Sequence, residues 1–424
     1  MRRHTAPIYV TIKRLKRSGG ISMKKTIIYF TGVYDTLDLF TDELRMAFEE
    51  MGYQSFVYDA MMQEVSKEAL LALLFGEQEI PVENIDLSKR FSVVTFNNLG
   101  YNLALLDGTN IWEKCNIPYL NILMDHPFHY EKPLRNAPDT SIVLGTDRNH
   151  VAYIRRFFRN IRQADFLPHA GVELHCKHKP LAERGIDVLY AGALPIYTVA
   201  RMIPDFTSIP EVDGEELAKN VLDELVRHPE KTTECAVEEY IKSVRNDIAE
   251  ERIHEIVVKM RFLDSYATSF FREQTVRMLV ESGITVTAYG TGWDQCEWSD
   301  NPHLKYGGKV LAPQILPLMN DSKIVLNTMT WFKAGAHDRI FNGMLAGSAV
   351  VTDDSTYLRR IFTDGKELAM FSLKEIQSLP DRVFALFGDL ASTQQMADCG
   401  YLAARADHTW KNRAKYLLEC HYID

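Results

Sequence analysis

The chain has 424 residues, too many for one ordinary hydrophobic core and suited to two domains of roughly 150–200 residues each. Hydrophobic residues make up 46% and charged residues 25%, which is typical of a folded globular protein and excludes disorder as the dominant state. The formal net charge of -9 at pH 7 provides no general attraction to nucleic acid, so we expect no nucleic-acid partner.

Residues 1–22 are basic, contain no acidic residue and lack the long apolar stretch of a signal peptide. We expect a disordered extension ahead of Met23, with a transit peptide or basic tail as the alternative. The six cysteines are scattered without CxxC spacing, which favours reduced thiols and a cytoplasmic protein. No run of eighteen apolar residues occurs, so we expect no transmembrane segment.

Residues 23–180 alternate between strand and helix patterns. A helix is expected over residues 37–51, ended by Gly52. The predicted strands are 26–30, 54–58, 91–96, 119–124, 141–144 and 165–167. Strands separated by helices indicate βαβ units and a parallel sheet, so this region predicts an N-terminal Rossmann-like domain.

A second α/β domain is predicted over residues 186–400, after a polar linker. It starts with a strand at 187–192, and a helical insertion follows at about 210–270. The insertion is expected to be structural, with substrate recognition as the alternative. Strand and helix patterns resume at 285–289, 312–320, 323–327, 338–345 and 349–352. Residues 401–424 predict a C-terminal helix that could cross back to the first domain.

Glycines at strand ends indicate a ligand crevice in the second domain. Gly192, Gly290 and Gly308 each follow a predicted strand or turn. Glycine lets backbone N–H groups approach a phosphate, and several such turns at one sheet edge indicate the crevice of an open α/β sheet. His337, Asp338 and Arg339 open a helix there, which suits a diphosphate; a capped helix with a surface arginine is the alternative.

The region around this helix resembles the C-terminal domain of family-1-like bacterial glycosyltransferases, especially those similar to the spore maturation protein CgeB. The resemblance covers about residues 186–415. The Tyr289-Gly290-Thr291-Gly292-Trp293 turn is similar to the family's "YG-x-GW". The other matching positions are Gly308, Val310, Leu326, Asn327, Arg339, Phe341, Asn342, Gly347, Phe362, Gly365, Glu367, His408, Thr409, Trp410 and Arg413.

This resemblance implies a GT-B fold, with two Rossmann-like domains and a deep cleft between them. A nucleotide diphosphate sugar would bind the second domain as donor and an acceptor would bind the first, with no cofactor or metal ion in the chemistry. The expected donor-binding residues are Gly192, Tyr289, Gly290, Gly292, Trp293, Gly308, Lys309, Val310, Asn327, His337, Asp338, Arg339 and Asn342. A homodimer is one assembly that the sequence allows.

Two positions depart from the family pattern. Asn342 replaces a glutamate that is expected to hold the donor ribose, and Ala334 occupies the position of a second, earlier glutamate separated from it by seven residues. These changes leave the donor and the stereochemistry of transfer open. A non-catalytic nucleotide-sugar-binding module and a GT-B sugar epimerase are therefore alternatives to a glycosyltransferase.

The first domain offers Asp125 and His126 as catalytic candidates, because they follow the strand at 119–124 and should face the cleft. Histidine is a common general base and an adjacent carboxylate can orient it. The alternative is that both residues only shape the turn before Pro127. His169, His175, Cys176 and His178 lack the spacing of a closed zinc site, so we interpret their segment as a linker.

Overall fold

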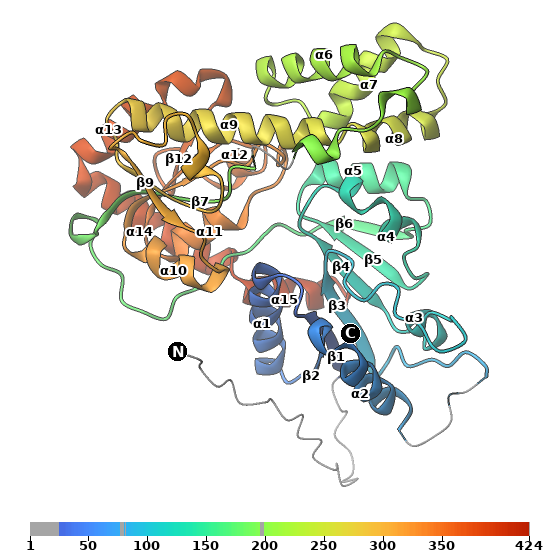
Figure 1. Cartoon of the computed structure of the whole chain (residues 1–424). Helices are drawn as coiled ribbons and strands as arrows, with labels where there is room; N and C mark the ends of the chain where they lie inside the picture. Colours follow the sequence, from blue (N-terminus) through green and yellow to red (C-terminus); the bar gives the residue numbers. More distant parts are fainter. Residues whose placement is uncertain (1–24, 77–79, 81, 196–198, 424) are drawn as a thin grey trace.

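The computed structural model describes residues 25–76, 80, 82–195 and 199–423. These residues form two six-stranded sheets that lie next to one another, and every strand pairing is parallel (Figure 1). The expected basic extension at residues 1–22 lies outside the described residues. Within the described ranges, no helix has the length and apolar character needed to cross a membrane.

The first sheet has the strand order β2-β1-β3-β4-β5-β6. Every residue of β3 and β4 is buried, as expected for central parallel strands covered by helices on both faces. The order reverses between β1 and β3, and such a reversal leaves a crevice at the carboxyl edge of the sheet. The strands are β1 (Thr26–Thr31), β2 (Gln54–Asp59), β3 (Phe91–Phe96), β4 (Tyr119–Leu123), β5 (Ser141–Gly145) and β6 (Gln163–Phe166).

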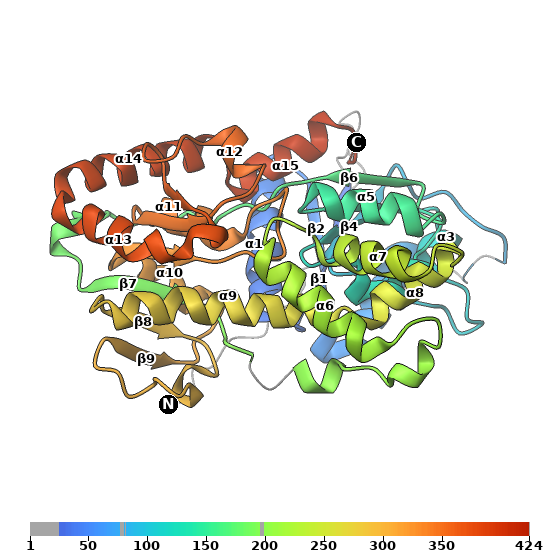
Figure 2. The same cartoon turned by 90° about the horizontal axis from the view of Figure 1, so that it is seen from above.

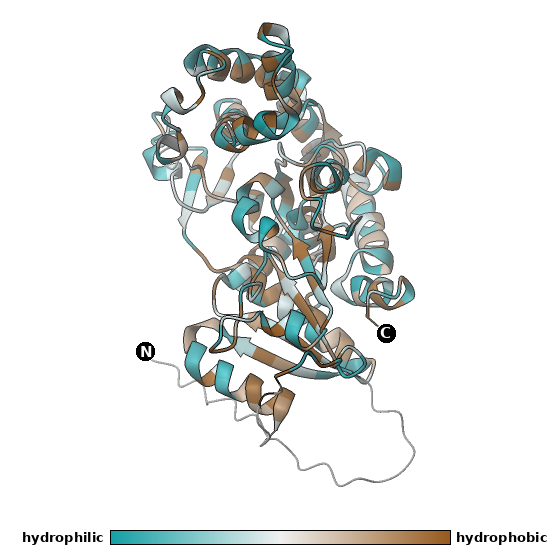
Figure 3. Ribbon diagram, turned by 90° about the vertical axis from the view of Figure 1, so that its right-hand side faces the viewer, coloured by the Kyte–Doolittle hydropathy of each residue, from teal (hydrophilic) through white to brown (hydrophobic). Residues whose placement is uncertain are grey.

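Helices connect these strands and cover both faces. The longest, α1 (Asp35–Glu50), buries Leu37, Leu44 and Phe48 at the spacing of one helical face. Figure 3 shows the same alternation of hydrophobic and hydrophilic residues along the outer helices. The other elements of this half are η1 (Ala60–Met62), α2 (Gln63–Phe75), α3 (Ile111–Lys114), η2 (Pro127–Tyr130), α4 (Glu131–Arg135) and α5 (Arg148–Phe157). The short turn η3 (Leu181–Glu183) follows in the chain and packs on β10 and α14 of the second half.

The second sheet has the order β12-β11-β10-β7-β8-β9. Two of its strands, β9 and β12, were not expected from the sequence. Of the five residues of β9 only Leu304 is buried, and β12 has just three residues, so neither has the apolar pattern of a longer strand. The strands are β7 (Ile186–Ala191), β8 (Val286–Tyr289), β9 (Leu304–Gly308), β10 (Ser322–Asn327), β11 (Ala349–Asp353) and β12 (Ala369–Phe371).

The helices of the second half pack on both faces of that sheet. Among them, α9 (Phe262–Glu281) runs along the sheet and connects it to the helices above the first sheet (Figure 2). The others are η6 (Trp293–Gln295), α10 (Ala312–Asn320), α11 (Asp338–Leu345), α12 (Leu358–Ile361), η7 (Leu373–Ser378), α13 (Leu379–Gly388) and α14 (Leu390–Asp407). The last helix, α15 (Trp410–Glu419), returns to the first half.

Three helices that lie in the chain between β7 and β8 pack on the first sheet instead of the second. They are α6 (Gly214–Arg227), α7 (Thr233–Val244) and α8 (Glu250–Lys259), preceded by the short turns η4 (Val199–Met202) and η5 (Phe206–Ser208). Leu217 and Val237 are buried in the same cluster as Leu123 of β4 and Ile154 of α5. The insertion expected at about 210–270 is thus continuous in sequence with the second sheet, yet the first half covers its apolar faces.

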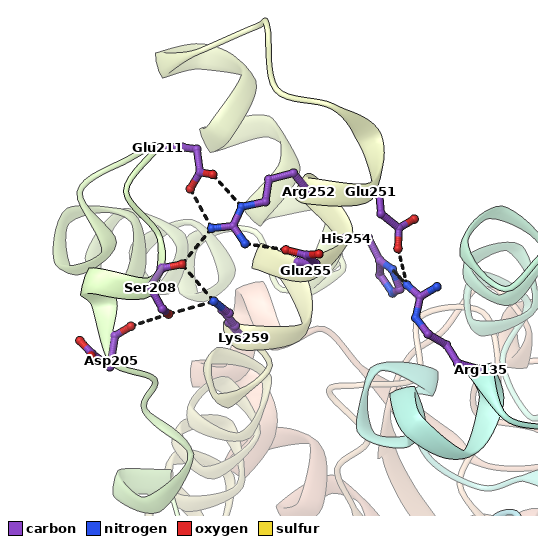
Figure 4. A network of polar contacts seen from close by, with 9 residues as sticks. All are labelled: Arg135, Asp205, Ser208, Glu211, Glu251, Arg252, His254, Glu255 and Lys259. Carbon is purple, nitrogen blue, oxygen red and sulfur yellow. Dashed lines mark hydrogen bonds and ion pairs between the residues drawn. The ribbon is translucent and has the colours of Figure 1, made fainter.

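Polar contacts hold this insertion together and tie it to the first half (Figure 4). Within the insertion, Arg252 of α8 makes a two-point ion pair with Glu211 at 2.7 and 3.0 Å. Between the two parts, Arg135 of α4 donates to Glu251 of α8 at 2.6 Å. The apolar cluster and these ion pairs together position the insertion over one face of the first sheet.

The C-terminal helix α15 packs against α1 of the first half. The indole of Trp410 is buried, with its ring centroid 4.9 Å from that of Phe40 and 5.5 Å from that of Phe96. At the rim of this contact, Lys411 pairs with Glu50 at 2.6 Å. Helix α15 therefore lies on the first half, beside α1.

Candidate active site

A cavity of about 430 Å³ lies where α1 faces the carboxyl ends of β7 and β8 and the start of α11. Asp35, at the start of α1, accepts the backbone N–H of Ala312 at 2.7 Å, which joins α1 to α10 at the rim. The lining residues are Asp35, Thr36, Leu39, Phe40, Ala191, Gly192, Ala193, Tyr289, Gly290, Thr291, Lys309, Val310, Leu311, Ala312, Ile315, Leu316, Met319, His337, Asp338, Arg339 and Asn342.

Most of the donor-binding residues expected from the sequence line this cavity. They are Gly192, Tyr289, Gly290, Lys309, Val310, His337, Asp338, Arg339 and Asn342. Four others, Gly292, Trp293, Gly308 and Asn327, are not among the lining residues. Trp293 instead supports the turn from behind, because its buried indole Nε1 donates to the carbonyl of Gly192 at 2.8 Å.

The glycine turns owe their residue type to close backbone packing. Gly290 has φ 121°, and a Cβ there would lie 2.6 Å from the backbone nitrogen of Ala193. Gly292 has φ 99°, and a Cβ there would lie 2.1 Å from the carbonyl oxygen of Leu194. Only glycine fits two loops held this close. Gly290 therefore presents bare backbone to the cavity, while Gly292 packs the same turn against Leu194 outside the lining.

Arg339 is a buried cation, 7% exposed, at the first turn of α11. Its Nη1 donates to Oδ1 of Asn327 at 2.7 Å, and its guanidinium lies 5.3 Å from the ring centroid of Tyr190. Burial lowers the pKa of this guanidinium. Among the residues that the structure describes, no carboxylate forms an ion pair with Arg339, so a bound anion would supply the missing charge.

Arg272 of α9 adds a second cation that the sequence analysis missed. It is 8% exposed and donates to the carbonyl of Ala193, a lining residue, while its Nε is buried without a partner. Its charge helps to lower the pKa of Arg339, after the larger effect of burial, so the two guanidinium groups lie near one another. The sequence offered only a weak signal for Arg272: it directly follows Phe271 and lies three positions before Thr275, so it falls on the side of α9 that these residues bury.

His337 and Asp338 begin α11. The Nδ1 of His337 accepts the backbone N–H of Arg339 at 3.2 Å, which makes His337 the N-cap. Burial raises the pKa of Asp338, but the neighbouring His337 and Arg339 outweigh it and hold that pKa well below its usual range. Asp338 is therefore an ionised hydrogen-bond acceptor in the cavity wall.

Asn342 lines the cavity, but both ends of its amide are already engaged. Its Oδ1 accepts the backbone N–H of Val172 at 2.8 Å, and its Nδ2 donates to Oδ2 of Asp338 at 3.0 Å. The amide thus joins α11 to the segment after β6 and orients Asp338. Asp338, which also lines the cavity, is thereby fixed in place by Asn342.

The two catalytic candidates of the first half have different environments. Asp125 is exposed, and its Oδ2 accepts from the hydroxyl of Tyr130 at 2.7 Å and from Nδ2 of Asn97 at 3.1 Å. His126 is 5% exposed, stacks on Phe128 and has its Nε2 3.3 Å from Oε2 of Glu234 in α7. Burial holds the pKa of His126 well below its usual value, so the ring is neutral.

Neither Asp125 nor His126 lines the cavity, and the charge of Asp125 acts on His169, which does not line it either. Burial lowers the pKa of His169 to about 4, while Asp338 and Asp125 act in the opposite direction. The ring of His169 lies 6.1 Å from that of His337. His169 therefore lies within electrostatic range of both carboxylates, whereas His126 faces the insertion. Across the described ranges, no cluster of His, Cys, Asp or Glu side chains is arranged to hold a metal ion.

Part of the chain is similar in sequence to a known protein family. Residues 269–419 match the glycosyl transferase-like family. They form a glycosyltransferase domain. No curated protein is significantly similar to the sequence.

Solved structures with similar folds cover almost the whole chain. Sucrose-phosphate synthase from Thermosynechococcus elongatus has 11% identity and a TM-score of 0.54, with 94% of this chain and 98% of that chain covered. Anabaena Alr3699/HepE, solved in complex with UDP and glucose, has 11% identity and a TM-score of 0.51, with 94% and 99% covered. The fold is GT-B, which confirms the fold expected from the sequence. The family match over residues 269–419 confirms the expected enzyme class.

Proposed function

We propose that this glycosyltransferase transfers a sugar from a nucleotide diphosphate sugar, bound in the cavity beside α11, to an acceptor on the carboxyl edge of the first sheet. The observation that carries the proposal is the pair of buried guanidinium groups, Arg339 and Arg272, beside glycine turns at a helix start. Neither cation pairs with a carboxylate in the part of the chain that the structure describes, and Arg272 Nε is buried without a partner. Two such cations suit a diphosphate, which supplies negative charge and several acceptor oxygens.

The donor's parts match different walls of the cavity. The diphosphate would lie against Arg339 and the backbone of Gly192 and Ala193, with Arg272 behind. The nucleoside would extend toward Tyr289, Gly290, Thr291, Lys309 and Val310. Asp338 suits a ribose hydroxyl, since it is ionised and is oriented by Asn342. This assignment explains how a site can work with Asn342 in place of glutamate.

In the transfer step, the acceptor oxygen forms a bond to the anomeric carbon as the bond from that carbon to the diphosphate oxygen breaks. Negative charge grows on the leaving diphosphate, where fixed guanidinium groups stabilise it more than they stabilise the bound donor. We assign Asp125 as the group that takes the acceptor proton, supported by its exposed carboxylate and its coupling to His169. We assign His126, buried and capping η2, to holding the loop that carries Asp125.

Two finer points belong to the same proposal. We place the chain near the bacterial proteins similar to CgeB, on the Tyr289–Trp293 turn and the late His408 and Arg413, which pack together with 3.2 Å between Nδ1 and Nη2. We also place the protein in the cytoplasm, supported by six cysteines that form no disulfide.

The test is a binding and turnover screen with the full chain. We expect one nucleoside diphosphate among UDP, GDP, CDP, ADP and dTDP to raise the Tm, and the matching nucleotide sugar to be consumed when acceptor is added. Absence of any shift across the panel would refute the proposal. Binding of a nucleotide sugar that no acceptor causes to be consumed would favour the non-catalytic module. Two observations support that alternative: the amide of Asn342 is already hydrogen-bonded within the protein, and Ala334 has no acidic side chain.

A further inference from the structure

An apolar face is exposed at the carboxyl edge of the first sheet, on the loops that follow β1 and β2. Five large apolar side chains there have exposed fractions between 43% and 79%. We call this the methionine face; its members are Val33, Tyr34, Met61, Met62 and Val65. Clustered exposed apolar side chains are unusual on a folded protein and typically mark a place where a ligand or partner binds.

The two loops form one surface because they touch at Gly32. Gly32 has φ 86°, and a Cβ there would lie 3.1 Å from Cγ of Met61 and 2.4 Å from Oδ1 of Asp59. The backbone N–H of Gly32 donates to Asp38 at 2.9 Å, which fixes the first loop on α1. Figure 1 shows β1, β2 and α1 grouped at the foot of the first half, facing the second half.

This face is continuous with the proposed donor cavity. Tyr34 is followed by Asp35 and Thr36, both of which line the cavity. On its other side Tyr34 lies close enough to Tyr130 to contribute to that residue's raised pKa, after burial and the charge of Asp125. Tyr130 donates to Asp125. A molecule resting on the methionine face would therefore reach both the cavity and the assigned proton acceptor.

The charges of the two segments that form the face disfavour an anionic ligand. Residues 32–38 and 59–66 contain no lysine or arginine. Their acids are Asp35, Asp38, Asp59 and Glu64. An acceptor that carries phosphate or carboxylate would be repelled by these groups, as would an anionic membrane surface. The methionines are flexible and polarizable, so they adapt to apolar rings and chains of different shape.

We propose that the acceptor is an uncharged alcohol or phenol with an apolar ring or short alkyl body that lies on the methionine face. This inference rests on the proposed function. The hydroxyl oxygen of the acceptor forms a bond to the anomeric carbon of the donor while the bond from that carbon to the diphosphate oxygen breaks. The hydroxyl proton passes to Asp125, and the nucleoside diphosphate leaves.

The test uses 2-naphthol as the probe. Its binding to the full chain is measured by fluorescence titration, with and without the nucleoside diphosphate that the Tm screen selects. In the double variant Met61→Ser/Met62→Ser we expect the naphthol Kd to rise about tenfold or more, because two apolar contacts are lost. The matched control is Met46→Ser, which removes another exposed methionine (44%) from α1, outside the methionine face. Nucleotide affinity and Tm should stay unchanged in all variants.

A turnover measurement supplies the second readout. With naphthol as acceptor, the double variant should raise KM about tenfold while donor hydrolysis in its absence is unchanged. Equal naphthol affinity in the wild type and the double variant would overturn the inference, as would preferred use of a hydrophilic sugar acceptor with unchanged KM. Both outcomes leave the proposed function intact if nucleotide still binds, whereas absence of nucleotide binding overturns both proposals.

Discussion

Single residues decide how the cavity at α11 works, and the arginines are the clearest case. Sequence reasoning selected Arg339 from its position at a helix start, but it could not distinguish a ligand-binding cation from a surface arginine. The tertiary structure buries Arg339 beside Asn327 and brings Arg272 from another helix into the same region. Two buried cations near one another are costly unless an anion joins them, which is why the pair indicates a binding site.

The first prediction at this scale concerns Arg339→Ala. We expect the affinity for the nucleoside diphosphate to fall about ten- to hundredfold, since a hydrogen bond to a charged group contributes about 1.5–3 kcal/mol. Isothermal titration calorimetry measures the change. Loss of the buried cation should leave Tm similar or raise it, so a low affinity together with an unfolded protein would not count as support. Unchanged affinity in a folded variant would remove Arg339 from the site.

A second prediction separates Arg272 from an ordinary helix arginine. Arg272→Ala should also weaken nucleotide binding about tenfold, because it removes charge beside Ala193 and Arg339. The matched control is Arg277→Ala on the same helix, where the guanidinium is exposed and pairs with Glu281 at 2.7 Å. Equal nucleotide affinities in the two variants would show that Arg272 has only a structural role.

At the scale of elements, strong local patterns were the predictable ones. The helices at 312–320 and 338–345 and the buried strand at 91–96 have the bounds expected from sequence. By contrast, β9 and β12 form because an existing sheet edge supplies hydrogen-bond partners, not because their own residues alternate. The apolar stripes of α6, α7 and α8 predicted amphipathic helices correctly, but a stripe carries no information about which surface will cover it.

Helix α15 leads to a prediction about stability. Trp410→Ala should lower the free energy of unfolding by about 3–5 kcal/mol, because the buried indole fills the contact with Phe40 and Phe96. Urea denaturation followed by circular dichroism measures the loss. Lys411→Ala is the control on the same helix, and its exposed pair with Glu50 should contribute less than about 1 kcal/mol. A loss in Trp410→Ala no larger than in the control would mean that α15 is not held by this contact.

For the whole molecule, buried histidines make stability depend on pH. Burial lowers the pKa of His150 and His169 to about 4 and that of His408 to about 3. In the unfolded chain these rings titrate near 6.5. Between about pH 6.5 and 4 the unfolded state therefore binds more protons than the folded state, and folding stability falls as pH falls.

The expected size is up to about 1.4 kcal/mol per pH unit for each of these histidines within that window. Urea midpoints measured at pH 7.0, 6.0 and 5.0 test the slope. His408→Gln should make the slope shallower, while His175→Gln, at an exposed position, should leave it unchanged. A midpoint that does not move between pH 6.5 and 5 would show that the buried rings do not govern acid stability.

Whether a feature could be predicted from the sequence or was decided only by the tertiary structure depends on how far apart in the chain the interacting residues are. Most strands and helices, the glycine turns and the start of α11 depend on residues that are neighbours in the chain, so the sequence was sufficient to predict them. The strands β9 and β12, which depend on a sheet edge, were not predicted. Other contacts join segments that are distant in the chain. Asn342 accepts from Val172, Arg272 donates to Ala193 in the cavity wall, and His126 lies beside Glu234. The insertion likewise packs on the first half. Only packing determines those contacts, since a side chain's partners depend on which surfaces the fold brings together.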